Sequence, residues 1–156
     1  MTRTARGLVT GLTLTLALLA GGCGGDDEDS KASDTPSSEA PTPTKDEFVQ
    51  QADAICAAGN EELSTAADAL GEAPTQEEIE GFASDTMVPN LQGQHDDIEA
   101  LGAPEGDEDD VQAILDALQT GIDALTADPS LITSSDDPLA DATDLAQTYG
   151  LQECGS

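Results

Sequence analysis

The chain has 156 residues, with 33 acidic side chains against four Lys and Arg, which gives a formal net charge of −29. Nucleic acid and bare anionic lipid are poor partners for such a chain, because binding either one requires a cationic protein surface. The sequence names no reaction and no ligand, but it predicts the destination of the chain and its approximate fold.

Residues 1–22 predict an export signal. Arg3 and Arg6 precede a 13-residue apolar run, LVTGLTLTLALLA, at residues 8–20. A permanent membrane span needs about 20 apolar residues, whereas the core of a signal peptide has roughly 7 to 15. The run therefore favours a signal peptide, with an uncleaved anchor helix as the alternative.

The small residues after this run resemble a bacterial lipoprotein signal, since Ala20, Gly21 and Gly22 precede Cys23. In such signals the cysteine receives a diacylglycerol thioether and becomes the mature N-terminus. The resemblance implies a lipid anchor at Cys23, on the extracytoplasmic face of the cell membrane. Ala20 stands where a large apolar residue is usual, so ordinary signal-peptidase cleavage is an alternative.

The cysteine count supports lipidation independently of this motif. The chain has three cysteines, and an odd number in an exported protein leaves one thiol to explain. Lipidation of Cys23 leaves Cys56 and Cys154, which we expect to form a disulfide outside the cytoplasm. Two separate buried thiols are the alternative. The bridge would close a loop of about 100 residues and contribute at most roughly 4 to 5 kcal/mol.

The segment after Cys23 predicts a disordered acidic linker over residues 23–44. Its sequence, GGDDEDSKASDTPSSEAPTPT, has no Leu, Ile, Val or aromatic residue and cannot bury a core. A flexible tether of this length spans about 25 Å. The acidic run at residues 26–29 is interpreted as a solvated spacer, with a weak cation site as the alternative.

Periodic apolar residues begin after Lys45 and predict the first helix of a folded domain over residues 45–156. Thr44 and Glu47 have the spacing of a capping box, in which each side chain bonds the backbone N–H of the other residue. Gly71 supplies the helix stop. The apolar face recurs every three or four residues, at Phe48, Ala52, Ile55/Cys56, Gly59, Leu63, Ala66 and Leu70.

A second capping box at Thr75 and Glu78 predicts the next helix, which Gly102 ends. Pro89 lies inside this segment, where the missing backbone N–H predicts a kink or a short break. Asp107 is predicted to cap the third helix. The apolar stripe of that third helix holds Val111, Ile114, Leu115, Leu118, Ile122 and Leu125.

The fourth predicted helix starts with Pro138 at its first position, after Asp137. Gly150 is its predicted C-cap, and Leu151 is expected to fold back onto it. Strand-type alternation is missing from the sequence. We therefore predict an all-α fold, a four-helix antiparallel bundle preceded by a disordered acidic tether.

The folded segment resembles a group of small exported proteins and lipoproteins of high-GC Gram-positive (actinobacterial) type. The matching phrases are FVQQADAIC with Cys56, VPNLQGQHDDIEALGAPEGDED, and LAQTYGLQECG with Cys154. They are spread over most of residues 45–155. The resemblance implies the helical fold and the paired cysteines, but no activity and no catalytic residue.

Candidate metal ligands are few. His95 and Glu99 share a helix face, but the other ligands of a zinc site would have to come from elsewhere. The acidic run 107–110 does not fit an EF-hand, which needs Gly at its sixth position, because that position is Gln112. We interpret this run and the pair 136–137 as helix starts, and we predict no metal site and no cofactor.

Motifs for catalysis are also missing from the sequence, which has no GxSxG, GxxxxGK[ST] or GxGxxG. The 27 acids of residues 45–156 offer many carboxylate pairs, and no spacing singles one out. We therefore predict that the protein is not an enzyme. An enzyme would need a concave pocket with at least two convergent polar groups, with His95 as one candidate.

These patterns predict a lipid-anchored protein of the cell envelope that binds a partner without transforming it. The expected partner is an envelope protein, a peptide or a small ligand, of neutral or positive charge. The acidic clusters give an alternative function, a buffer or sensor of divalent cations.

Overall fold

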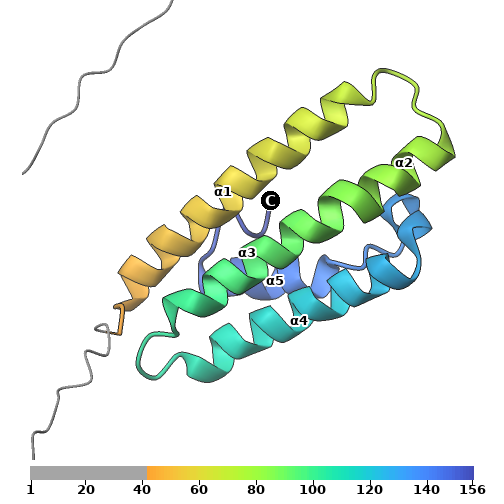
Figure 1. The fold of residues 1–156 in the computed structure, drawn as a ribbon. Helices are drawn as coiled ribbons and strands as arrows, with labels where there is room; N and C mark the ends of the chain where they lie inside the picture. Colours follow the sequence, from red (N-terminus) through yellow and green to blue (C-terminus); the bar gives the residue numbers. More distant parts are fainter. Residues whose placement is uncertain (1–41) are drawn as a thin grey trace, which may run out of the picture. The chain divides into compact units, whose positions relative to one another are not determined.

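The computed structural model describes residues 42–156. The predicted signal peptide, the lipidation of Cys23 and the predicted linker up to residue 41 lie outside the described residues. The described part is all-α, as predicted, and consists of four antiparallel helical segments (Figure 1). Its helices are α1 (Lys45–Ala69), α2 (Gln76–Phe82), α3 (Val88–Leu101), α4 (Glu108–Ala127) and α5 (Ala140–Tyr149). None of these helices has the length and apolar character needed to cross a bilayer.

Both predicted capping boxes are confirmed. At the start of α1 the Glu47 carboxylate accepts from the Thr44 backbone N–H at 2.9 Å, and the Thr44 hydroxyl accepts from the Glu47 N–H. Thr75 and Glu78 repeat this arrangement at the start of α2. The hydrogen bonds from Thr44 lower the pKa of Glu47, because they favour the ionised carboxylate. Both helix starts are thus fixed by local sequence.

Pro89 perturbs the second segment without interrupting it. A single π-helical turn, η1 (Ala83–Met87), joins α2 to α3, and the Val88 N–H bonds the carbonyl of Ala83 five residues back. A proline ring inside a regular α-helix collides with the carbonyl four residues earlier, which here belongs to Asp85 in that wider turn. The predicted disturbance is therefore confirmed as a wider turn, and the helix continues through it.

The predicted side-chain cap at Asp107 is wrong. Asp107 does occupy the N-cap position of α4, but its carboxylate makes no capping hydrogen bond. It accepts instead from the Tyr149 hydroxyl at 2.8 Å and lies 3.2 Å from Lys45 Nζ. Partners from α5 and α1 thus turn this side chain away from the helix that it precedes.

The last helix starts two residues later than predicted, because Pro138 and Leu139 form a turn ahead of α5. A short 3-10 helix, η2 (Pro129–Thr133), occupies the connection from α4. The predicted C-terminus of α5 is confirmed. Gly150 adopts φ 118°, the left-handed region that favours glycine, and the Leu151 N–H bonds the carbonyl of Ala146.

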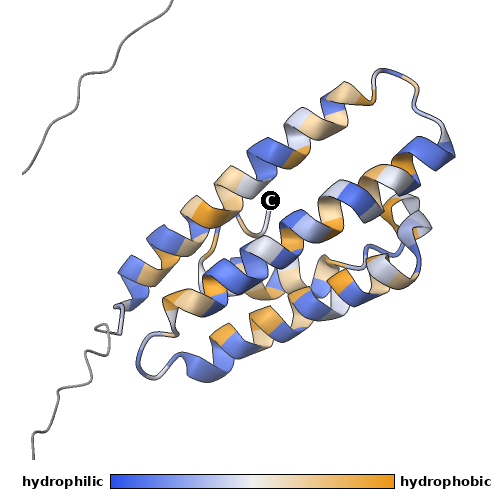
Figure 2. Cartoon of the chain, in the orientation of Figure 1, coloured by the Kyte–Doolittle hydropathy of each residue, from blue (hydrophilic) through white to orange (hydrophobic). Residues whose placement is uncertain are grey.

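Neighbouring helices pack in the order α1, α3, α4, α5. In Figure 2 apolar and hydrophilic residues alternate along each helix, as amphipathic segments require. The core is divided into two clusters. The larger centres on Phe48, Ile98, Leu115 and Leu151, and the smaller on Leu91, Ile122 and Leu125.

The tail after α5 is held against α1. The predicted pairing of Cys56 and Cys154 is confirmed, as a disulfide between residues 98 apart in sequence whose Cα atoms are 5.0 Å apart. Polar contacts to Glu153 reinforce it. Its backbone N–H donates to Asp53 Oδ1 at 2.9 Å, and its carbonyl accepts from Asn60 Nδ2 at 2.9 Å. One covalent and two polar links therefore fix the tail on the first helix.

Candidate functional site

A cavity of about 250 Å³ lies between the two core clusters. Every helical segment and the C-terminal tail contribute to its wall. The larger apolar side chains that line it are Leu63, Leu91, Ile98, Ile114, Leu118 and Leu139. An unfilled apolar cavity destabilises a protein, by about 24 cal/mol per Å³ in large-to-small core substitutions. A bound apolar molecule of matching size would therefore stabilise this fold.

No charged side chain lines this cavity, although residues 45–156 carry 27 acids. The two cysteines in its wall, Cys56 and Cys154, are joined in the disulfide, so neither is a nucleophile. The remaining polar side chains in the wall are amides and hydroxyls, of Asn60, Gln94 and Thr143 among others. Groups of this kind bind and orient a ligand but do not act as general acids or bases near neutral pH.

Gln94 is the one buried polar residue in the described part of the chain, with 8% of its surface exposed. Its Nε2 donates to Asn90 Oδ1 at 2.7 Å. Among residues 42–156, no side-chain N or O atom that is withdrawn from water lacks a hydrogen-bond partner. The cavity wall thus combines apolar side chains with polar groups that are already satisfied or in contact with solvent.

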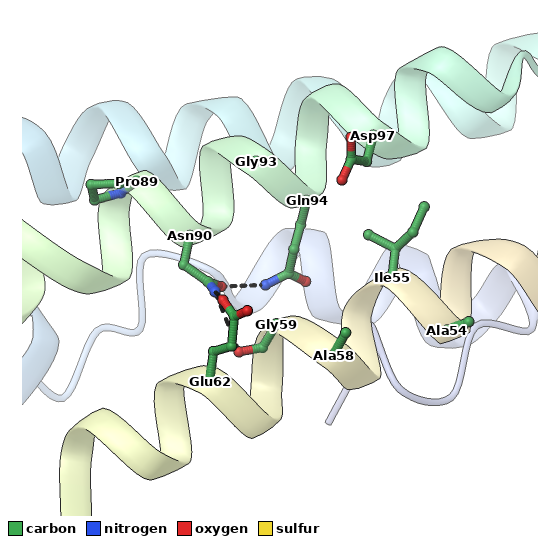
Figure 3. Close-up of a pocket in the computed structure, with 10 residues that line it drawn as sticks. All are labelled: Ala54, Ile55, Ala58, Gly59, Glu62, Pro89, Asn90, Gly93, Gln94 and Asp97. Atoms are coloured by element: carbon green, nitrogen blue, oxygen red, sulfur yellow. Dashed lines mark hydrogen bonds between the residues drawn. The ribbon is translucent and has the colours of Figure 1, made fainter. Parts of the chain in front are cut away.

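Gly59 allows the close approach of α1 to Gln94 (Figure 3). A Cβ added at Gly59 would overlap the Gln94 amide. Asn90, one turn before Gln94, donates from Nδ2 to Glu62 Oε2 at 3.1 Å and to the Gly59 carbonyl at 3.4 Å. The α1–α3 contact therefore fixes the Gln94 side chain by sterics on one side and a hydrogen bond on the other.

The C-terminal tail forms one wall of the cavity through Leu151, Cys154 and Ser156. It is attached on both sides, because Cys154 is bonded to α1 and Gln147 Nε2 on α5 donates to the Gly155 carbonyl. Ser156 Oγ also accepts from Asn60 Nδ2 at 3.3 Å. The disulfide thus serves as a structural crosslink and as part of the cavity wall.

A separate polar cluster of Lys45, Asp107 and Tyr149 lies at the end of the bundle where α1 begins. Lys45 Nζ sits 3.9 Å from the centroid of the Tyr149 ring, and the ring of Phe48 meets that of Tyr149 edge to face at 6.0 Å. The hydrogen bond from Tyr149 holds the pKa of Asp107 below its usual value. Burial, together with this carboxylate, raises the pKa of the Tyr149 phenol. None of these three residues lines the cavity between the core clusters.

The other candidate residues from the sequence do not converge on the cavity. His95 lies on α3 with its Nδ1 3.2 Å from Asp96 Oδ1, and it does not line the cavity. Within residues 42–156, His, Cys, Asp and Glu side chains form no group of three that could hold a metal ion. Among the predicted site residues in the range 42–156, the structure joins Cys56 to Cys154.

Sequence reasoning missed Gln94 and the cavity beside it. The signal for Gln94 was present, since it falls on the apolar face of α3 between Leu91 and Ile98, three and four residues away. A polar residue at such a position is expected to be buried. No sequence pattern indicates the cavity in the same way, because its volume depends on how the four helical segments pack together.

Comparison of the chain with models of protein families, with curated proteins and with solved structures gives no match.

Proposed function

We propose that the chain is a lipid-anchored protein on the extracytoplasmic face of the cell membrane, which binds a partner and does not catalyse a reaction. The observation that carries this proposal is the disulfide between Cys56 and Cys154. Disulfides of this kind persist outside the reducing cytoplasm. An exported location also agrees with the signal-like residues 1–22, and it leaves Cys23 as the cysteine available for acylation.

Binding is favoured over catalysis by the chemistry of the cavity. Its wall combines apolar side chains with a few amides and hydroxyls, a composition typical of ligand sites. It lacks a charged side chain that could transfer a proton or clamp a phosphate or carboxylate. A neutral ligand in this cavity, or a cationic partner on the acidic surface, matches the charge of the protein.

Mass spectrometry of the intact chain from the membrane fraction tests the location. We expect the mass of residues 23–156 with a diacylglycerol group, and two alkylatable thiols only after treatment with a reductant. The matched control is Cys23→Ala, which should carry no acyl group and keep the disulfide. An acyl-free wild-type chain, or thiols that react before reduction, would contradict the proposal.

A further inference from the structure

We infer that the cavity between the four helical segments binds a small, uncharged and largely apolar molecule. The inference deepens the proposed binding function and rests on it. It assigns the disulfide-held tail as a wall of the binding site.

The size of the ligand follows from the cavity volume of about 250 Å³. An apolar cavity of roughly 150 Å³ binds benzene, and sites for drug-sized ligands start at roughly 300 Å³. This cavity lies between those values. Its occupant is therefore larger than one aromatic ring, and two fused rings are a suitable size.

The charge of the ligand follows from the wall and from the surface around it. A buried ion requires a partner of opposite charge, and no charged side chain lines the cavity. The described surface carries 27 acids with Lys45 as its single Lys or Arg, so an anion would also be repelled before it entered. Burial therefore disfavours an ion of either sign, and the acidic surface disfavours an anion further.

The experiment uses residues 23–156 with Cys23→Ala, which removes the acyl group so that no detergent is needed and leaves the cavity as in the wild type, labelled at the Ala and Leu methyl groups for NMR. Three probes of equal ring size are added separately: 2-naphthol, naphthalene and 2-naphthoate. We expect the two neutral probes to shift the Ala142 and Leu118 methyl signals and leave that of Ala67 in place, because Ala142 and Leu118 line the cavity and Ala67 is exposed on α1. The anion 2-naphthoate is expected to bind at least tenfold more weakly than naphthalene.

Ala142→Leu adds volume inside the cavity and should weaken both neutral probes at least tenfold. Ala67→Leu makes the same change on the exposed face of α1 and should leave binding unaltered. If wild-type cavity methyls do not respond to any probe, the inferred site is wrong, whether or not the variants fold. That result would not contradict the proposed acyl group at Cys23 or the disulfide. Conversely, an acyl-free wild-type chain together with a responsive cavity would overturn only the proposed location.

Discussion

The Tyr149 hydroxyl donates a hydrogen bond to Asp107 Oδ2 at 2.8 Å, although the two residues are 42 positions apart. Lys45 approaches the same oxygen at 3.2 Å and covers the Tyr149 ring. This cluster therefore joins the start of α1, the residue before α4 and the last turn of α5. It provides the only salt bridge of a Lys or Arg in the described residues, so its ionisation should be visible in the stability of the whole bundle.

Tyr149→Phe tests how the ionisation of Asp107 contributes to stability at low pH. In the folded protein the pKa of Asp107 lies below the ordinary value of an aspartate, chiefly because of the hydrogen bond from Tyr149. A lowered pKa contributes stability above the unfolded value, and that contribution is lost as the pH falls through the folded value. We expect wild type to be more stable than Tyr149→Phe at pH 7, and the difference to shrink below about pH 4. Urea unfolding followed by circular dichroism measures it; a difference that is constant down to pH 2 would contradict the assignment.

The dependence of stability on alkaline pH tests the ionisation of the Tyr149 phenol. Burial and the Asp107 carboxylate raise the pKa of Tyr149 above the ordinary value of a tyrosine. A raised pKa contributes stability that is complete below the unfolded value and is lost as the pH rises toward the folded value. Above about pH 10 the free energy of unfolding of the wild type should therefore fall more than that of Tyr149→Phe, which has no phenol to ionise. Spectrophotometric titration of the single tyrosine gives an independent check, since a phenol with an ordinary midpoint would exclude the raised pKa.

Reduction of the disulfide should destabilise the fold substantially. The chain-entropy argument for a loop of 98 residues gives about 4 to 5 kcal/mol as an upper value, and small domains have total stabilities of about 5 to 15 kcal/mol. We expect the urea midpoint to fall sharply on reduction, and the double variant Cys56→Ser/Cys154→Ser to unfold like the reduced chain. A loss of less than about 1 kcal/mol would show that the packing of the tail suffices without the crosslink.

The helices and their caps follow from local sequence, which is why their prediction succeeded. Thr44 with Glu47 and Thr75 with Glu78 satisfy each other across one turn, and Gly150 needs only its own freedom at positive φ. The predicted side-chain cap at Asp107 failed because the actual partners of this carboxylate, Tyr149 and Lys45, are distant in sequence and outcompete a local cap. Local rules cannot rank a cap against a tertiary contact.

The apolar stripe of α1 shows a second limit of sequence reasoning. Its face was predicted to continue to Leu70, but burial ends at Gly59, and Leu63, Ala66 and Leu70 remain half-buried. Periodicity shows which face of a helix is apolar, but it does not show how far neighbouring helices extend along that face. The cavity lies where this packing loosens, with Leu63 in its wall.

Gly59→Ala should be destabilising even though alanine is the better helix former. The new methyl overlaps the Gln94 amide, and overpacking of this kind costs about 1 to 3 kcal/mol. Gly81→Ala on α2 is the matched control, because no atom lies within 4 Å of its added Cβ, and it should gain about 0.5 to 1 kcal/mol. The pair Gly59→Ala/Gln94→Ala should recover part of the loss. Equal gains at both glycines would show that the α1–α3 contact at Gln94 is loose.

Salt should stabilise the protein, because the 27 acids of residues 45–156 repel one another and dissolved ions screen that repulsion. We expect the thermal midpoint to rise with NaCl and to rise equally with CaCl₂ at the same ionic strength. The alternative function as a divalent-cation buffer or sensor predicts a far larger shift with millimolar calcium. Equal shifts would dispose of that alternative. A calcium-specific shift would instead require several carboxylates to converge on one ion. If the acidic first turn of α4 supplied them, Asp109→Asn and Asp110→Asn would reduce that calcium-specific shift.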